Sequence, residues 1–111
     1  MKLNINRLNL NLLSDLMDEI HDRYFNLSQV VFDREMLEWK LNFGNSKKEP
    51  FDNLLRIKGV HEYTYCKDQG IERYMINKLE INIDKQSIII ESCQYLTLNL
   101  SINPDFEIYV E

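Results

Sequence analysis

The spacing of hydrophobic residues changes early in the chain, from alternation to a helical period. Leucine and isoleucine alternate with asparagine over the first dozen residues, which predicts a short edge strand or an ordered arm. From Leu13 onwards the apolar positions follow i, i+3, i+4, i+7 and i+11 as far as Tyr24, on one face of a helix. Ser14 is a candidate N-cap, and acidic residues follow it, where carboxylates stabilise the helix dipole. We therefore predict a helix over about 14–22.

Apolar and polar residues alternate through most of the remaining chain, which is the pattern of half-buried strands. The predicted strands are 27–32, 37–43, 54–67 with a bend at Gly59, 79–83, 87–93, 96–102 and 106–110. The polar segments that predict turns or loops are 33–35, 44–50, 68–70, 84–86 and 103–105. Residues 71–78 fit both helical and strand spacing, so the sequence leaves their structure open.

Short connections between the strands predict antiparallel pairing, because parallel strands need longer crossovers. The chain has 111 residues, which is enough for one domain, and no linker or repeat divides residues 1–111. It contains no alanine, the best helix former, and its apolar residues are mainly isoleucine, leucine and aromatics. The expected fold class is α+β, mainly β, with one N-terminal helix packed on an antiparallel sheet or sandwich of six to seven strands.

The charge distribution limits the classes of partner. The formal net charge is −5, and it is spread evenly, with −2 on residues 1–55 and −3 on residues 56–111. Without a basic stripe, the chain is a poor candidate for binding nucleic acid or anionic membranes. A negative charge is compatible with a basic protein partner, whose approach it would steer.

Hydropathy and cysteine content predict a cytoplasmic location. No apolar run is longer than three residues, and the N-terminus lacks the apolar region of a signal peptide. In that compartment Cys66 and Cys93 are expected to be reduced.

Candidate chemistry is sparse. His21 and Asp22 follow Asp18, and on a helix these three side chains could share one face, as a base or the start of a metal site. A metal site needs three or four ligands, however, and only His61 adds a second imidazole. The alternative is that His21 ends a helix whose acidic side chains face water.

Nucleophilic and phosphate-binding motifs are also missing. Cys66 has no activating neighbour in sequence except Lys67, and the chain has no G-x-S-x-G, P-loop, G-x-G-x-x-G or C-x-x-C motif. We therefore predict no enzymatic activity, no catalytic residue, no cofactor and no metal.

The segment from His61 to Tyr65 is the best candidate for a binding surface. In a regular strand, His61, Tyr63 and Tyr65 lie on one face. An exposed stripe of histidine and aromatic residues is typical of protein interfaces, whereas the same residues buried would be cross-strand core packing.

One stretch of the chain resembles a known group of proteins. It comprises Ile20-His21-Asp22, the strand and acidic turn at 27–33, the return strand at 37–43, and the apolar–Gly–Val pattern at 55–60. It resembles small bacterial proteins that are mostly uncharacterised, some of which are assigned as immunity proteins of toxin systems. The resemblance covers residues 19–60. It implies a binding module in which His21 and Asp22 are the most characteristic residues, and it implies no catalytic role for them.

Three functions follow as hypotheses. The first is a non-enzymatic cytoplasmic protein-binding domain, in particular an immunity-type protein that neutralises a basic toxin through His21, Asp22, His61, Tyr63 and Tyr65. The second is a small metal-binding protein or enzyme that uses His21 and Asp22. The third is a structural domain that forms homo-oligomers through free sheet edges.

Overall fold

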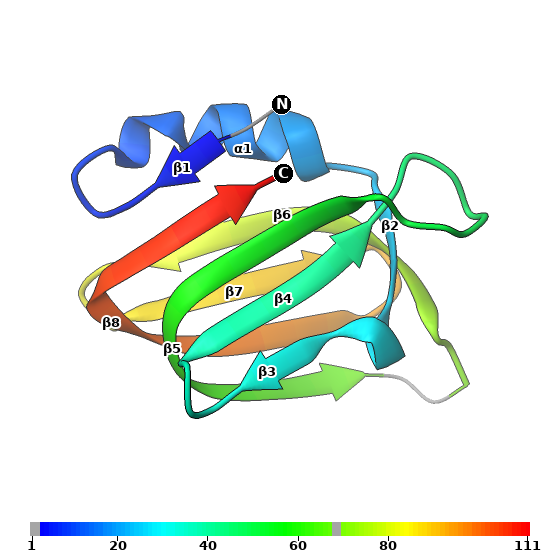
Figure 1. Cartoon of the computed structure of the whole chain (residues 1–111). Coiled ribbons are helices and arrows are strands. Elements are labelled where there is room, and N and C mark those ends of the chain that lie inside the picture. The colour runs from blue at the N-terminus through cyan, green and yellow to red at the C-terminus, as the bar shows by residue number, and fades with distance from the viewer. Residues whose placement is uncertain (1–2, 68–69) are drawn as a thin grey trace.

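The computed structural model describes residues 3–67 and 70–111, which form mainly antiparallel strands with one short α-helix (Figure 1). A 3₁₀ turn, η1 (Leu10–Leu12), leads into the helix α1 (Leu13–Ile20), and a second 3₁₀ turn, η2 (Leu27–Gln29), separates β2 from β3. The strands are β1 (Leu3–Ile5), β2 (Tyr24–Asn26), β3 (Val31–Asp33), β4 (Glu38–Phe43), β5 (Asn53–Lys67), β6 (Arg73–Asn82), β7 (Ser87–Ser92) and β8 (Leu96–Val110). No helix in the described part of the chain is long and apolar enough to cross a membrane.

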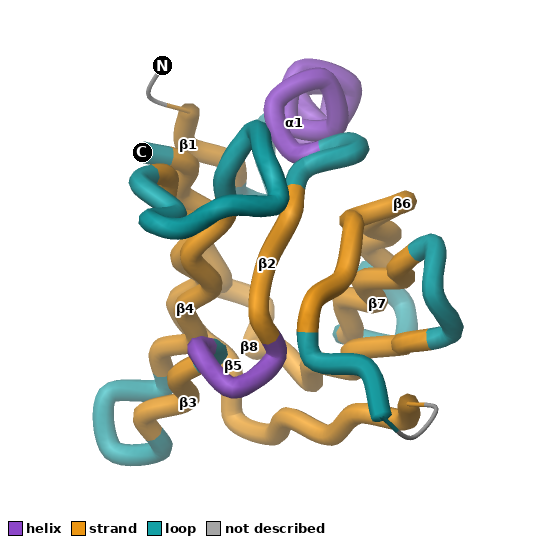
Figure 2. Tube along the Cα trace, turned by 90° about the vertical axis from the view of Figure 1, so that its right-hand side faces the viewer, coloured by secondary structure: helices purple, strands orange, loops and turns teal. Residues whose placement is uncertain are grey.

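The strands form one curled sheet. Their order is β2-β6-β7-β8-β5-β4-β3, with β1 paired to β8, and every pairing between these strands is antiparallel. The sheet curls until β2 also meets β4, where Tyr24 and Gly44 exchange backbone hydrogen bonds of 2.9 and 3.0 Å. Figure 2 shows β2 descending from α1 between β4 and β6. The prediction of a mainly β antiparallel fold is thus confirmed, whereas the sandwich alternative is not.

Two long bent strands, β5 and β8, are the central pair of the sheet. Gly59 bends β5, as predicted, at a φ of +86°, which L-residues with a side chain rarely adopt. Lys58 pairs with Glu107 while Val60 pairs with Ile102, so residues 103–106 of β8 lie opposite Gly59. A Cβ on Gly59 would lie 3.1 Å from the Cα of Phe106, which explains why glycine is needed here.

The turn predicted at 103–105 is wrong, because these residues lie inside β8. Pro104 favours a turn in sequence, but it falls in the irregular stretch that β5 does not pair residue by residue. Its missing N–H therefore costs no ladder hydrogen bond, which is the condition under which strands tolerate proline.

The core lies inside the curl and is filled by alternate residues of the strands. On β4, Trp39, Leu41 and Phe43 are buried while Asn42 between them is exposed, as the alternation predicted. The fully buried side chains also include Leu16 and Ile20 from α1.

Three local predictions need correction or completion. The helix was predicted over 14–22 with Ser14 as N-cap, but it begins at Leu13 with Leu12 in the cap position and ends at Ile20. The ambiguous segment 71–78 is strand from Arg73 onwards, since it pairs with β2 and β7. The predicted strand 27–32 is interrupted, because η2 occupies its first half. The turn predicted at 68–70 lies partly outside the described residues, which omit 68 and 69.

Candidate functional site

The predicted binding residues lie in two separate places. His21 and Asp22 follow the end of α1, whereas His61, Tyr63 and Tyr65 lie on the second half of β5. In Figure 1, α1 is at one end of the molecule and this half of β5 is at the opposite end. The five residues therefore do not form a single site.

The His21–Asp22 pair is an exposed contact at the end of the helix. The Nδ1 of His21 lies 3.3 Å from Oδ2 of Asp22, and their side chains are 50% and 57% exposed. The predicted shared face with Asp18 is wrong, because the helix ends before His21 and Asp22 has a φ of +62°. The backbone N–H of Asp22 donates to Ile76 at 2.8 Å, which fixes this turn against β6.

No metal centre forms around this pair. Within residues 3–67 and 70–111, no group of three or more His, Cys, Asp or Glu side chains is placed to hold a metal ion. Cys66 and Cys93 are free and exposed.

The second half of β5 contributes to a cluster of rings that we call the aromatic seam, which is formed by Phe32, Trp39, Tyr63 and Tyr65. Tyr63 is at its centre, with its ring centroid 6.1 Å from that of Phe32 and 5.8 Å from that of Trp39, both edge-to-face. The Tyr65 ring follows at 5.9 Å. Exposure increases along the seam, since Trp39 is buried, Tyr63 is half-buried and Tyr65 is 50% exposed. The seam therefore connects the core to the surface.

Strand register explains why these rings meet. Trp39 pairs with Phe32 on one side and Ile57 on the other, so all three side chains point to the same face of the sheet. Tyr63 and Tyr65 pair with Leu100 and Leu98 of β8, whose side chains are buried. The tyrosines thus project from the concave face of the sheet, where β3 and the bent β5 approach each other.

His61 does not follow the predicted alternation with the two tyrosines. Val60 pairs with Ile102 and Glu62 pairs with Ser101, so His61 is the extra residue of a bulge and has no cross-strand partner. It is exposed, as is Glu62. The sequence could not show this bulge, because it depends on pairing with β8.

A groove lies between β3 and the second half of β5. It has a volume of about 410 Å³ and is lined by Phe32, Arg34 and residues 61–64. The Arg34 guanidinium carbon lies 5.9 Å from the centre of the Phe32 ring. Sequence reasoning missed Phe32 and Arg34 as part of a site, because their only signal was an apolar strand followed by a polar turn.

One carboxylate and one cation line the groove itself, Glu62 on the β5 side and Arg34 on the β3 side. Asp33 and Glu35 flank Arg34 in the exposed turn after β3. Lys67, the cation on the segment 61–67, lies beyond the lining residues. Carboxylates therefore outnumber cations in the groove and its adjoining turn.

Burial dominates the chemistry of the Tyr63 hydroxyl. Neither this hydroxyl nor the Nε1 of Trp39 makes a hydrogen bond with normal geometry, although both atoms are shielded from water. Burial raises the pKa of Tyr63 well above its ordinary value, the nearby Tyr65 raises it further, and the Trp39 side chain partly opposes the rise. Tyr63 consequently stays protonated at any physiological pH.

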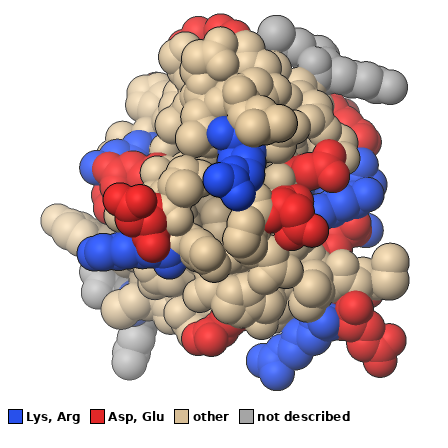
Figure 3. Space-filling view, turned by 90° about the vertical axis from the view of Figure 1, so that its left-hand side faces the viewer, with Lys and Arg blue, Asp and Glu red and all other residues tan. Residues whose placement is uncertain are grey.

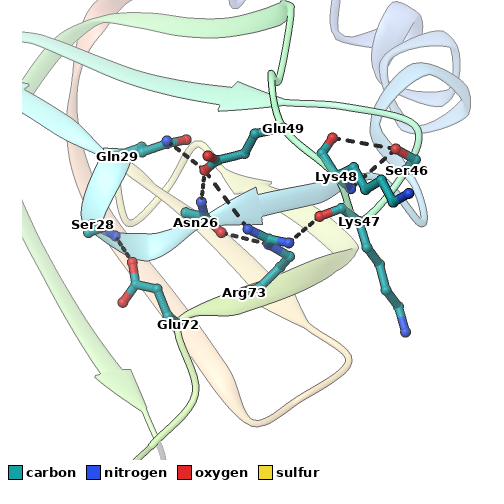
Figure 4. A network of polar contacts seen from close by, with 9 residues as sticks. All are labelled: Asn26, Ser28, Gln29, Ser46, Lys47, Lys48, Glu49, Glu72 and Arg73. Atoms are coloured by element: carbon teal, nitrogen blue, oxygen red, sulfur yellow. Dashed lines mark hydrogen bonds and ion pairs between the residues drawn. The ribbon is translucent and has the colours of Figure 1, made fainter.

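A separate polar network anchors the loop after β4 to β2 and β6 (Figure 4). Asn26 is buried and donates to Oε1 of Glu49, while its own Oδ1 accepts from Nε of Arg73 at 2.9 Å. Gln29 donates to the same Glu49 oxygen at 3.0 Å, and Arg73 also donates to the carbonyl of Lys47. The residues of the network form these hydrogen bonds with one another, so we assign the network a structural role.

One further face of the molecule has mixed charge. On the face shown in Figure 3, basic and acidic side chains are interspersed among uncharged residues.

No protein-family model matches the chain, and no curated protein matches it significantly. The resemblance to immunity proteins therefore remains a prediction.

Proposed function

We propose that this protein is a non-enzymatic binding domain that recognises a basic protein partner through the aromatic seam and its groove. The observation that carries the proposal is that partly exposed aromatic rings lie next to a groove of about 410 Å³, which is lined by Glu62 and adjoins the turn with Asp33 and Glu35. Aromatic side chains at a surface, with a polar rim, are the anchors that protein interfaces favour.

The net charge supports the same class of partner. A charge of −5 accelerates encounter with a cationic protein, and the aromatic rings then supply contact area that does not depend on salt. A toxin whose basic active site is masked in this way fits the chemistry, as in immunity proteins. A cytoplasmic location belongs to this proposal and is a prediction from the sequence.

Affinity purification from the source cells tests the proposal. Wild-type protein is expected to retain a partner with a basic isoelectric point, and Tyr65→Ser is expected to lose it, because that change removes the most exposed ring of the seam. Tyr95→Ser is the matched control, since Tyr95 is 81% exposed in the turn between β7 and β8. Retention of the same partner by both variants, or no partner for the wild type, would contradict the proposal.

A further inference from the structure

The second half of β5 is an open sheet edge. Residues 62–67 pair with β8 on one side, whereas β4 pairs with β5 only from Asn53 to Lys58. The backbone N–H groups of Gly59 and Val60 donate to the carbonyl of Leu37, and this contact ends the coverage of the second edge. In the part of the chain that the structure describes, no strand pairs with the other side of residues 61–67.

This edge has unused hydrogen-bonding capacity. Along an edge strand, alternate residues direct their N–H and C=O groups away from the sheet. At 61–64 this edge lines the groove whose other wall is Phe32 of β3 and Arg34 of the following turn. An extended chain placed there would satisfy them by continuing the sheet.

We propose that the occupant of the groove is an extended peptide segment of the partner, which adds as a strand antiparallel to residues 61–67 of β5. This inference rests on the proposed function and specifies its mode of recognition. Main-chain hydrogen bonds supply affinity in this mode, and side chains on the two faces of the added strand supply specificity.

The residues on each face determine which peptide fits. Tyr63 and Tyr65 project from the concave face, so alternate residues of the peptide should be aromatic or aliphatic in order to pack beside them. The other alternate residues lie beside Glu62 and Thr64 and should be basic or carry hydroxyl groups.

Glu62 determines where a basic residue of the peptide is expected. In the antiparallel arrangement, the C-terminal half of the peptide lies beside Glu62. Lysine or arginine is therefore expected in the C-terminal half of the peptide, where opposite charges attract across the strands.

Selection from a library of random ten-residue peptides, displayed on phage, tests this inference with the full-length protein. The expected result is enrichment of peptides with alternating apolar residues and with lysine or arginine towards the C-terminal half. Selection with Glu62→Lys should reverse the charge preference, whereas Glu80→Lys, at an exposed position on β6, should leave it unchanged. Failure to enrich any such peptide, or the same preference with Glu62→Lys, would overturn the inference.

An enriched peptide, resynthesised with alternate amides N-methylated, separates strand addition from side-chain contact alone. N-methylation removes hydrogen-bond donors. There are two such peptides, one for each set of alternate amides, and only the peptide whose methylated amides face β5 should bind at least tenfold more weakly. Amide exchange of residues 61–67 should slow when the unmodified peptide binds. Equal affinity of both methylated peptides would overturn strand addition while leaving the proposed function intact. If neither the wild type nor Tyr95→Ser retained a natural partner in the affinity purification, the proposed function itself would be refuted.

A second copy of the chain is the alternative occupant, which amide exchange without peptide would detect. Protection of residues 61–67 without any peptide, together with a dimeric mass in light scattering, would show that the edge pairs with itself and would overturn the inference.

Discussion

Single residues control the shape of the sheet at its bend, and Gly59 is the clearest case. Gly59 and Gly70 share a φ of +86°, but a Cβ would meet Phe106 only at Gly59, since nothing lies within 4 Å of the corresponding position at Gly70. Alanine at Gly70 therefore has only the free-energy cost of a positive φ, whereas alanine at Gly59 adds the cost of a steric contact with Phe106.

We expect Gly70→Ala to lower the free energy of unfolding by about 1 kcal/mol and Gly59→Ala by about 2–4 kcal/mol, because the second change adds a steric contact to the conformational cost. Chemical denaturation of both variants measures the difference. Equal losses would mean that contact with Phe106 does not constrain position 59.

Tyr63 gives a pH-dependent prediction at the same scale. Its pKa is raised on folding because of burial, so the protonated form is favoured in the folded state. This contribution to stability is fully present below the ordinary tyrosine pKa of about 10 and is lost as the pH rises above it, when the unfolded chain ionises. The variant Tyr63→Phe removes the titrating group and should lose less stability than the wild type above pH ~10.

At neutral pH the same variant should be as stable as the wild type or more stable by about 1 kcal/mol, because it removes a shielded hydroxyl that makes no hydrogen bond of normal geometry with the described residues. Urea unfolding between neutral and alkaline pH measures both effects, with Tyr95→Phe as the control for loss of an exposed hydroxyl. A steeper alkaline loss for Tyr63→Phe than for the wild type would contradict the assignment.

At the scale of elements, the fold depends on polar contacts that join segments distant in sequence. Asn26 on β2 links Arg73 on β6 to Glu49 in the loop after β4. Its replacement by alanine removes a buried amide and its hydrogen bonds to the partly exposed guanidinium and carboxylate.

We predict that Asn26→Ala lowers the free energy of unfolding by about 1–3 kcal/mol, because it removes two hydrogen bonds to charged groups. Asn99→Ala, at an exposed position on β8, should cost less than about 0.5 kcal/mol. Thermal or chemical unfolding checks this, and similar losses at both positions would show that the network does not stabilise the loop.

At the scale of the whole molecule, the first and last strands belong to the same part of the sheet. Leu3 of β1 pairs with Val110 of β8, and Figure 1 shows β1 beside the end of β8. Chains whose ends are close usually tolerate circular permutation when the new ends lie in an exposed turn.

A permutant with its original ends joined by a short Gly/Ser linker and opened between Asp84 and Lys85 should retain the strand-rich circular dichroism spectrum and unfold cooperatively. Both residues lie in the exposed turn between β6 and β7. Opening the chain within β5 after Tyr63 is the contrasting design, because it interrupts the central pair with β8, and it should not fold. Folding of the second design with the stability of the first would refute the central role of that pair.

The sequence by itself determined the period of each element and thereby the class of the fold. Alternation identified β4, the end of β6 and both halves of β8, because side chains of a strand project to opposite faces with a period of two and one face is buried. Polar turns on either side delimited β5 and β7. Glycine at position 59 also marked the bend, because residues with a side chain rarely adopt a positive φ. The sequence also identified the segment from His61 to Tyr65 as a candidate surface.

Only the tertiary structure decided the features that depend on contacts between distant residues. Pro104 continues a strand because its partner strand bends away from it, and residues 73–78 are strand because β2 and β7 pair with them. The bulge at His61, the approach of Phe32 to Tyr63 and the open edge of β5 likewise depend on register and curvature. Local patterning cannot encode these, because pairing energy comes from residues that are far apart along the chain.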